Sequence, residues 1–252
     1  MTERRRAIVV GGAGGLGSAI CRRLASEGHR IVIADINEEG ARNVQASLDG
    51  EGHETVRLDV MSDEAVHAAF DAIEAGGPAA VLVIASGGPV VNLGMRINAA
   101  TISMADWKKT IDFNLNSVFC CAQKFAQQRL AEPLDDMRIV IIGSSVGVSV
   151  GSGPDIAYVA SKAAIYGLTR QLAFEMAPSG MTVNAVAPGP VGTPEFHRMA
   201  PEHIVAGIAA ASVFKRLGEP DEVAAAVSFL VSRDAAYATG STLDINGGVH
   251  MR

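Results

Sequence analysis

Near its N-terminus the chain reads Ala7-Ile8-Val9-Val10-Gly11-Gly12-Ala13-Gly14-Gly15-Leu16-Gly17, and a segment of helical character follows near residues 16–28. The apolar run predicts a strand, so the glycines lie in the turn between a strand and a helix. Residues without a Cβ let the backbone approach a phosphate, and a helix N-terminus presents unpaired N–H groups with a partial positive charge. The stretch therefore predicts a turn that binds the pyrophosphate of a dinucleotide.

The glycines of this turn fit two spacings. Gly12, Gly14 and Gly17 satisfy G-x-G-x-x-G, whereas Gly11, Gly15 and Gly17 satisfy G-x-x-x-G-x-G. The order of strand, turn and helix makes the motif specific, but the spacing alone does not choose between the two patterns.

The rest of the chain repeats the alternation of strand and helix. Short β-branched runs predict strands at 7–10, 30–34, 55–58, 79–85, 138–142, 182–186 and 242–245, and helical segments lie near 16–28, 38–48, 62–75, 104–130, 156–177 and 220–232. This alternation indicates a parallel sheet with crossover helices, and the continuous apolar runs suit strands covered on both faces. No linker or repeat divides the chain. We expect an α/β fold, a single-domain doubly wound parallel β-sheet (Rossmann fold) over residues 1–252, with helices on both faces.

Composition excludes several classes of function. The 252 residues carry a formal net charge of -6, which argues against a nucleic-acid partner. The longest apolar run, residues 79–85, is too short to span a membrane, so no membrane association is expected. The three cysteines and six histidines lack the spacing of metal ligands, which predicts no metal and fits a reducing, cytoplasmic location.

Asp35 closes the second predicted strand, eighteen residues after Gly17. A carboxylate at about this distance accepts hydrogen bonds from the adenosine ribose hydroxyls, and it would repel a 2'-phosphate. The next residue is Ile36, and the turn holds no Lys or Arg. The sequence therefore favours NAD over NADP. The alternative is that Asp35 caps the next helix, a role that Asn37 could serve equally well.

A second motif is Tyr158-Val159-Ala160-Ser161-Lys162, with Ser145 thirteen residues before the tyrosine. Side chains four residues apart share one face of a helix, so the ammonium can stabilise a phenolate. Tyr158 is therefore a candidate acid/base group, although a surface pair of Tyr and Lys is the alternative.

Taken together, these motifs resemble the short-chain dehydrogenase/reductase family over nearly the whole chain. The matches are the spacing G-x-x-x-G-x-G, Asp35, Leu58-Asp59-Val60, Asn114, Gly143-Ser144-Ser145, Tyr158 with Lys162, Val183-Asn184-Ala185-Val186-Ala187-Pro188-Gly189, Thr193 and Asn246-Gly247-Gly248. The resemblance implies a catalytic set of Asn114, Ser145, Tyr158 and Lys162. It implies a cofactor set of Gly11, Gly14, Gly15, Leu16, Gly17, Asp35, Ile36, Asp59, Val60, Ala85, Ser86, Gly87, Tyr158, Lys162, Pro188, Gly189, Val191 and Thr193.

The family also implies roles for these groups. Tyr158 would exchange the proton of the alcohol, Lys162 would stabilise the phenolate and hold the nicotinamide ribose, and Ser145 would contact the substrate oxygen. Ser144 is the rival of Ser145, and the spacing to Tyr158 favours Ser145. Asn114 would break its helix locally and hold a water molecule that links Lys162 to solvent. The resemblance further implies a homotetramer that packs its helices 104–130 and 156–177 against symmetry mates.

The chain departs from the family pattern at two places. Val10 stands where the family usually has Thr, and Ile84-Ala85-Ser86-Gly87 replaces the usual Asn-Asn-Ala-Gly. Two segments are expected to face the substrate: a loop near residues 86–102 and a lid near 190–212. In the first, Val90, Val91, Leu93, Met95 and Ile97 suggest an apolar wall. Arg96 and His197 could meet an acidic substrate or stay in solvent.

The leading interpretation is a reversible NAD-dependent oxidoreductase that acts on a small-molecule secondary alcohol or its ketone. A non-catalytic NAD-binding sensor or scaffold of the same fold is the alternative. It would need the glycines and Asp35 but not Tyr158. A nucleotide-sugar epimerase or dehydratase would also use Tyr and Lys, but the chain lacks the length of the separate substrate domain that such enzymes carry.

Overall fold

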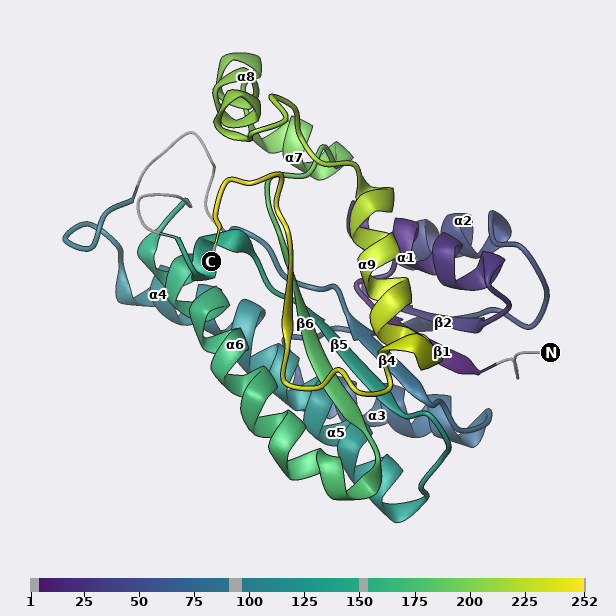
Figure 1. Ribbon diagram of the computed structural model, residues 1–252. Helices are drawn as coiled ribbons and strands as arrows, with labels where there is room; N and C mark the ends of the chain where they lie inside the picture. Colours follow the sequence, from purple (N-terminus) through teal and green to yellow (C-terminus); the bar gives the residue numbers. More distant parts are fainter. Residues whose placement is uncertain (1–4, 91–96, 150–153, 252) are drawn as a thin grey trace.

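The computed structural model describes residues 5–90, 97–149 and 154–251 (Figure 1). Its strands form one seven-stranded parallel sheet in the order β3-β2-β1-β4-β5-β6-β7. The strands are β1 (Arg6–Val10), β2 (Arg30–Asp35), β3 (Glu54–Arg57), β4 (Val81–Ile84), β5 (Arg138–Ile142), β6 (Thr182–Pro188) and β7 (Thr242–Ile245). The predicted doubly wound parallel sheet is confirmed.

The helices are α1 (Gly15–Ser26), α2 (Glu38–Ala46), α3 (Asp63–Ala75), α4 (Met104–Ile111), α5 (Ser117–Ala131), α6 (Ile156–Met176), α7 (Pro194–Met199), α8 (Glu202–Ala211) and α9 (Pro220–Val231). A π-helical turn, Asp112–Asn116, joins α4 to α5, and 3-10 turns occupy Ser145–Gly147, Ala177–Ser179 and Arg233–Ala235. Helices α3, α5 and α6 cover one face of the sheet, and α1, α2 and α9 cover the other (Figure 1).

Two hydrophobic cores lie on the two faces of the sheet. Successive strand residues point to opposite faces, so Ile8 and Val10 of β1 enter the core under α3, α5 and α6. Ala7 and Val9 of the same strand enter the core under α1 and α9. Coverage on both faces explains why the strands read as continuous apolar runs rather than as alternating patterns.

The sheet positions a ligand crevice at its carboxyl edge. After β3 the chain crosses over β1 to form β4, so the connections from β1 and β4 leave the sheet in opposite directions. Open α/β sheets bind ligands at such a switch point. Helices α7 and α8 lie over this edge of the sheet (Figure 1).

The structure differs from the sequence prediction in four elements. The strand expected at 79–85 is shorter, and the helix expected at 104–130 is interrupted by the π-helical turn. The lid expected near 190–212 contains α7 and α8. Thr193 caps α7, and Pro194 occupies its first position, where a missing N–H costs nothing. Strand β6 runs on to Pro188 because its β5 partner ends at Ile142, so the proline breaks no ladder hydrogen bond there.

Among the described residues, no helix has both the length and the apolar character required to cross a bilayer. Within the same ranges, no group of three or more His, Cys, Asp or Glu side chains is placed to hold a metal ion.

Candidate active site

The glycine turn leaves β1 and enters α1 along a path that only some of its glycines require. Gly11 has a φ of 77°, and a Cβ there would lie 2.7 Å from the backbone nitrogen of Ser86. A Cβ on Gly17 would lie 2.0 Å from the carbonyl oxygen of Gly11, whereas one on Gly14 would be in ordinary contact at 3.5 Å. Added Cβ atoms on Gly12 and Gly15 would also be crowded, at 2.8 Å from Ile33 Cγ2 and 2.7 Å from Glu195 Oε2. Of the two spacings, only the one that starts at Gly12 includes a position without steric demand, Gly14, and this favours G-x-x-x-G-x-G.

Asp35 stabilises the glycine turn through backbone hydrogen bonds. Its Oδ2 accepts a hydrogen bond from the backbone N–H of Ala13 at 2.9 Å, and its Oδ1 accepts one from Asn37 N–H at 2.9 Å. Asn37, not Asp35, caps α2, because its Oδ1 accepts from Gly40 N–H at 3.0 Å. The alternative role of Asp35 as a helix cap is thereby excluded.

A cavity of about 350 Å³ opens between the turn and the ends of β2, β3 and β4. The cavity is lined by residues of the glycine turn, by Asp35, and by residues that the sequence did not predict. The lining comprises Gly11, Ala13, Gly14, Ala34, Asp35, Ile36, Asn37, Leu58, Asp59, Val60, Met61, Ala85, Ser86, Gly87, Phe113 and Glu195. Gly15, Leu16, Gly17, Pro188, Gly189 and Thr193 lie outside this lining, and Val191 lines a second cavity beside β7.

Two observations test whether the cavity fits a dinucleotide. The buried hydroxyl of Ser86 has no hydrogen-bond partner within the described residues, so a polar group on a ligand could satisfy it. A carboxylate oxygen of Glu195 already accepts a hydrogen bond from Gly15 N–H at 3.2 Å, so the start of α1 holds an anion. The residues present therefore fit an adenine dinucleotide.

Asn114 lies in the π-helical turn and is fully buried. Its Nδ2 donates to the carbonyl oxygens of Gly88 and Thr110, at 3.0 and 3.1 Å, and its Oδ1 accepts from Gly88 N–H at 2.8 Å. The widened turn thus lets one amide bind both its own helix and the backbone beyond β4. The local break in the helix agrees with the role that the family implies.

Lys162 and Tyr158 project from α6, which Asp155 caps by accepting from Tyr158 N–H at 2.9 Å. The ammonium of Lys162 lies 5.8 Å from the centre of the Tyr158 ring and donates to the carbonyl oxygen of Ile142 at 3.1 Å. A Cβ on Gly87 would lie 3.2 Å from Lys162 Nζ and 2.9 Å from Asn114 Oδ1. The glycine thus lets the backbone pass close to both side chains.

Burial shifts the two titratable groups in opposite directions. It lowers the pKa of Lys162 to about 8, because the charged ammonium is the form that loses solvation. Burial also raises the pKa of Tyr158 to about 12, against a lowering by the Ser144 hydroxyl, and Tyr166 and Asp155 add smaller upward shifts. Without bound cofactor or substrate, Tyr158 is therefore a neutral phenol at pH 7, which is the form that donates a proton.

Of the two adjacent serines, Ser144 is the one whose side chain lowers the pKa of the Tyr158 phenol. Its backbone is held by Tyr166, which accepts a hydrogen bond from Ser144 N–H at 3.0 Å and donates one to the Ser144 carbonyl. Ser145 begins the 3-10 turn and is 5 % exposed. The spacing of thirteen residues favours Ser145, but a residue count through a loop does not determine which of two adjacent side chains faces the helix.

The segment after β6 reaches back to the glycine turn. Gly189 lies against the backbone of Asn246, where a Cβ would be 2.7 Å from its carbonyl oxygen. Thr193 Oγ1 accepts from Phe196 N–H at 3.1 Å and so caps α7. The cap directs Glu195, in the first turn of α7, onto Gly15. No local sequence signal could have revealed this contact between residues 180 positions apart.

The expected apolar wall is only partly visible. Val91, Leu93, Met95 and Arg96 lie outside the described residues. Ile97 forms an isolated parallel bridge with Asp155, which places the end of that segment beside the start of α6. The ring of His197 lies edge-on to Phe196, with ring centres 6.1 Å apart.

Comparisons with known proteins agree with this arrangement. A family model described as enoyl-(acyl carrier protein) reductase matches residues 11–250. The chain is similar to an acetoacetyl-CoA reductase from Acinetobacter sp. (strain RA3849), with 39 % identity over 100 % of both chains. It is also similar to the 3-oxoacyl-(acyl-carrier-protein) reductase FabG of Escherichia coli (strain K12), with 36 % identity over 99 % of this chain and 98 % of the relative.

Among solved structures, a 3-oxoacyl-(acyl-carrier protein) reductase from Brucella melitensis with bound NAD superposes with a TM-score of 0.89 and 27 % identity, covering 100 % of this chain and 93 % of the other. The family match, the relatives and the site geometry agree. The chain is a member of the short-chain dehydrogenase/reductase family and an oxidoreductase that uses a nicotinamide cofactor.

Proposed function

We propose that the protein interconverts a ketone and a secondary alcohol with NAD(H) as the hydride carrier. The observation that carries the proposal is the pairing of the Tyr158 phenol with the Lys162 ammonium, which lies beside Gly87 of the cavity lining, while the Ser144 side chain acts on the same phenol. The names of the two relatives, both reductases of 3-oxoacyl compounds, support ketone reduction as the direction to test first.

Each side chain has a distinct role in the proposed reaction. The nicotinamide supplies or accepts the hydride. Tyr158 donates the proton to the carbonyl oxygen, for which its neutral phenol is the competent form. Ser144 holds the same oxygen and stabilises the charge that develops on it. Lys162, a cation below about pH 8, binds the ribose hydroxyls and stabilises the phenolate that remains after proton transfer.

Asn114 positions these groups without touching the substrate. It ties the backbone at Gly88 to the π-helical turn, so the path that passes Lys162 stays fixed. We include the expected water link between Lys162 and solvent in the proposal.

Charges near the adenosine ribose support NAD. Asp35 faces the cavity, and Glu38 lies next to it at the start of α2. Arg57 and Arg42 approach Glu38 at 3.6 and 3.5 Å, so both cations already have an anionic partner. A 2'-phosphate would therefore meet the Asp35 carboxylate, and these two arginines already have an anionic partner.

Replacing Asp35 with Ala is expected to weaken NADH binding about 10- to 100-fold and to shift preference towards NADPH, because charge-assisted hydrogen bonds to the ribose are lost. Wild type and variant are assayed in parallel with NADH and NADPH against a panel of linear and cyclic ketones and 3-oxoacyl thioesters. An unchanged NADH to NADPH ratio contradicts the ribose role. Wild type that binds NADH but turns over no substrate favours the non-catalytic sensor.

Replacing Ser144 with Ala is expected to lower kcat for the substrate found in that panel by about 100-fold, since one donor to the developing oxyanion is lost. The matched variant Ser145→Ala should keep kcat within a few-fold, because Ser144 is the serine whose side chain lowers the pKa of the Tyr158 phenol. Steady-state kinetics of both variants decide which serine contacts the substrate oxygen. A larger loss from Ser145→Ala than from Ser144→Ala reverses the assignment.

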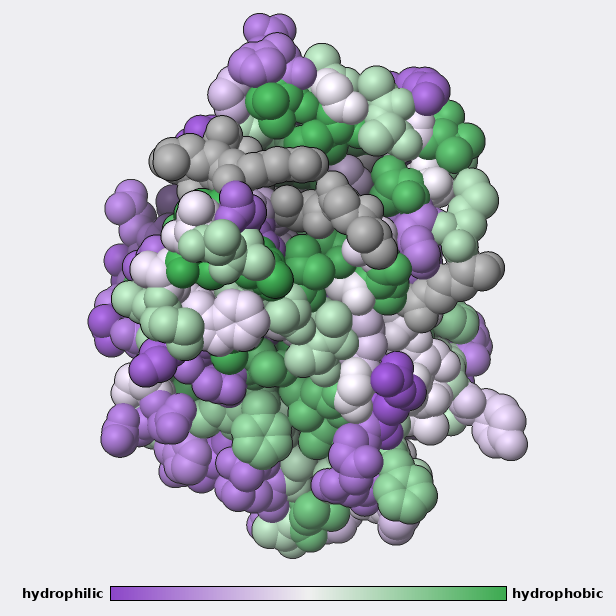
Figure 2. All heavy atoms as spheres, turned by 90° about the vertical axis from the view of Figure 1, so that its left-hand side faces the viewer, coloured by the Kyte–Doolittle hydropathy of each residue, from purple (hydrophilic) through white to green (hydrophobic). Residues whose placement is uncertain are grey.

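The larger organisation is part of the same proposal. It comprises one domain over residues 1–252 with a substrate loop near 86–102 and a lid near 190–212, assembled as a homotetramer. Phe119 and Leu130 of α5 and Phe174 of α6 are exposed by 43, 52 and 79 %, and burial against symmetry mates would remove them from water. Figure 2 shows hydrophobic surface continuing down one side of the molecule between hydrophilic flanks. The three cysteines are free and buried, which is compatible with a cytoplasmic location.

A further inference from the structure

An acidic side chain of the lid occupies the start of α1. Glu195 Oε2 accepts a hydrogen bond from Gly15 N–H at 3.2 Å, across 180 residues of chain. Helix α1 has no side-chain N-cap of its own and no acidic residue in its first turn. A Cβ on Gly15 would lie 2.7 Å from both Glu195 Oε2 and Thr193 Cβ, so this part of the lid packs directly on the glycine turn.

The same donors are those that a dinucleotide pyrophosphate needs. Unpaired N–H groups and the helix dipole at α1 attract one anion at a time. Glu195 also lines the cavity that contains Gly14 and Asp35, so its carboxylate lies within the path of the cofactor. A carboxylate and a pyrophosphate cannot share Gly15 N–H, and their like charges repel each other at this distance.

We propose that Glu195 is an internal competitor of the cofactor pyrophosphate, so that cofactor binding expels its carboxylate and detaches α7 from the glycine turn. The inference rests on the proposed use of NAD(H) and goes beyond it, since it makes lid position depend on the cofactor. Arg198 supports it: its Nη2 lies 3.1 Å from Glu195 Oε1 on the exposed side of α7, so the expelled carboxylate keeps a cationic partner.

A purely structural cap at α1 predicts the opposite result. If Glu195 only caps α1, removing it lowers stability and leaves cofactor affinity unchanged or weaker. If it competes, removing it lowers the stability of the free protein but raises cofactor affinity, because the cofactor no longer displaces an anion. The sign of the affinity change therefore separates the two roles.

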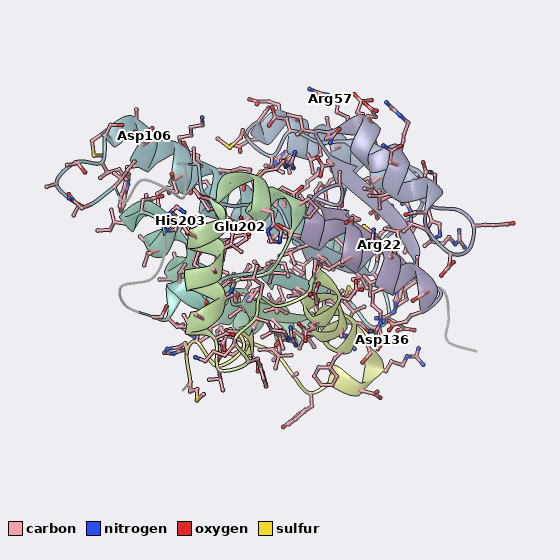
Figure 3. All side chains as sticks on the ribbon, turned by 90° about the horizontal axis from the view of Figure 1, so that it is seen from above. Arg22, Arg57, Asp106, Asp136, Glu202 and His203 are labelled. Atoms are coloured by element: carbon pink, nitrogen blue, oxygen red, sulfur yellow. The ribbon has the colours of Figure 1, made fainter. Side chains whose placement is uncertain are left out.

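The test measures NADH, ADP and adenosine affinity by fluorescence titration or calorimetry for wild type, Glu195→Gln and Glu195→Ala. Competition predicts that NADH and ADP bind about three- to tenfold more tightly to both variants, a partial gain because the contact is half-exposed. Adenosine, which lacks phosphate, should bind all three proteins alike. The control is Glu202→Gln, an exposed carboxylate in the first turn of α8 that Figure 3 labels. It should leave every affinity at the wild-type value.

Three results would overturn the inference. Wild-type protein that binds NADH with an affinity equal to or tighter than that of both Glu195 variants contradicts competition but leaves the proposed function intact. An equal gain for adenosine assigns the effect to general loosening of the lid rather than to the pyrophosphate. If neither wild type nor any variant binds NADH, both the competition and the proposed function fail.

Discussion

Replacing Tyr158 with Phe is expected to reduce turnover of the identified ketone by about 100- to 10,000-fold, the contribution of a positioned general acid. The phenol is the group on which the Ser144 side chain acts, and the Lys162 ammonium lies 5.8 Å from the centre of the same ring. Phenylalanine keeps the ring and its packing but has no proton to donate. Its loss should therefore appear in kcat rather than in cofactor binding.

The measurement pairs steady-state kinetics with an NADH titration. NADH affinity should stay within a few-fold of wild type, because the cavity around Asp35 does not include Tyr158. Tyr237→Phe is the matched control, since that phenol is fully exposed and should leave both quantities unchanged. Retention of more than a tenth of wild-type turnover in Tyr158→Phe contradicts the assignment of Tyr158 as the acid.

The sequence predicts the sheet well because strand signals in this fold are local. Val81 to Ile84 and Arg138 to Ile142 are covered on both faces, so their apolar character alone identifies them. The π-helical turn at Asp112–Asn116 has no comparable local signal. It exists because Asn114 binds the backbone at Gly88, a contact across 26 residues that helix periodicity does not encode.

The candidate site likewise combines residues that local motifs predict with residues whose positions depend on contacts between distant parts of the chain. The glycine turn, Asp35, Tyr158 and Lys162 follow from motifs whose spacing is fixed within one turn or one helix. The choice between Ser144 and Ser145 depends on how the chain leaves β5, where Ser144 is still extended with a φ of -171° and Ser145 begins a 3-10 turn. The position of the Glu195 side chain depends on the contact between α7 and the start of α1. The sequence of neither helix indicates that the two come together.

The pKa shifts add the effect of burial to the sequence interpretation. The spacing of Tyr158 and Lys162 suggests that the ammonium makes the phenol acidic, but burial raises the pKa of Tyr158 to about 12. Burial also weakens the hold of Lys162 on its proton. The positive charge of an oxidised nicotinamide would then supply the rest of the stabilisation that alcohol oxidation requires, whereas ketone reduction can begin from the neutral phenol.

Replacing Gly17 with Ala is expected to abolish measurable NADH binding, with an affinity loss of at least about 100-fold. The added Cβ would lie 2.0 Å from Gly11 O and 2.8 Å from Gly12 Cα, and both neighbours are backbone atoms that cannot rotate away. The turn must open to admit the methyl group, which moves the N–H groups of α1 away from the pyrophosphate. Overpacking of this kind also costs about 1–3 kcal/mol of unfolding free energy.

Gly207→Ala is the matched control, because Gly207 lies in α8 and an added Cβ meets no atom within 4 Å. An exposed helical glycine replaced by alanine should raise stability by about 0.5–1 kcal/mol and leave NADH binding unchanged. Thermal unfolding and NADH titration of both variants give opposite signs for stability and a loss of binding in Gly17→Ala alone. A Gly17→Ala protein that binds NADH normally would mean that the turn can shift without cost. The requirement for a glycine at position 17, which both glycine spacings share, would then lose its support.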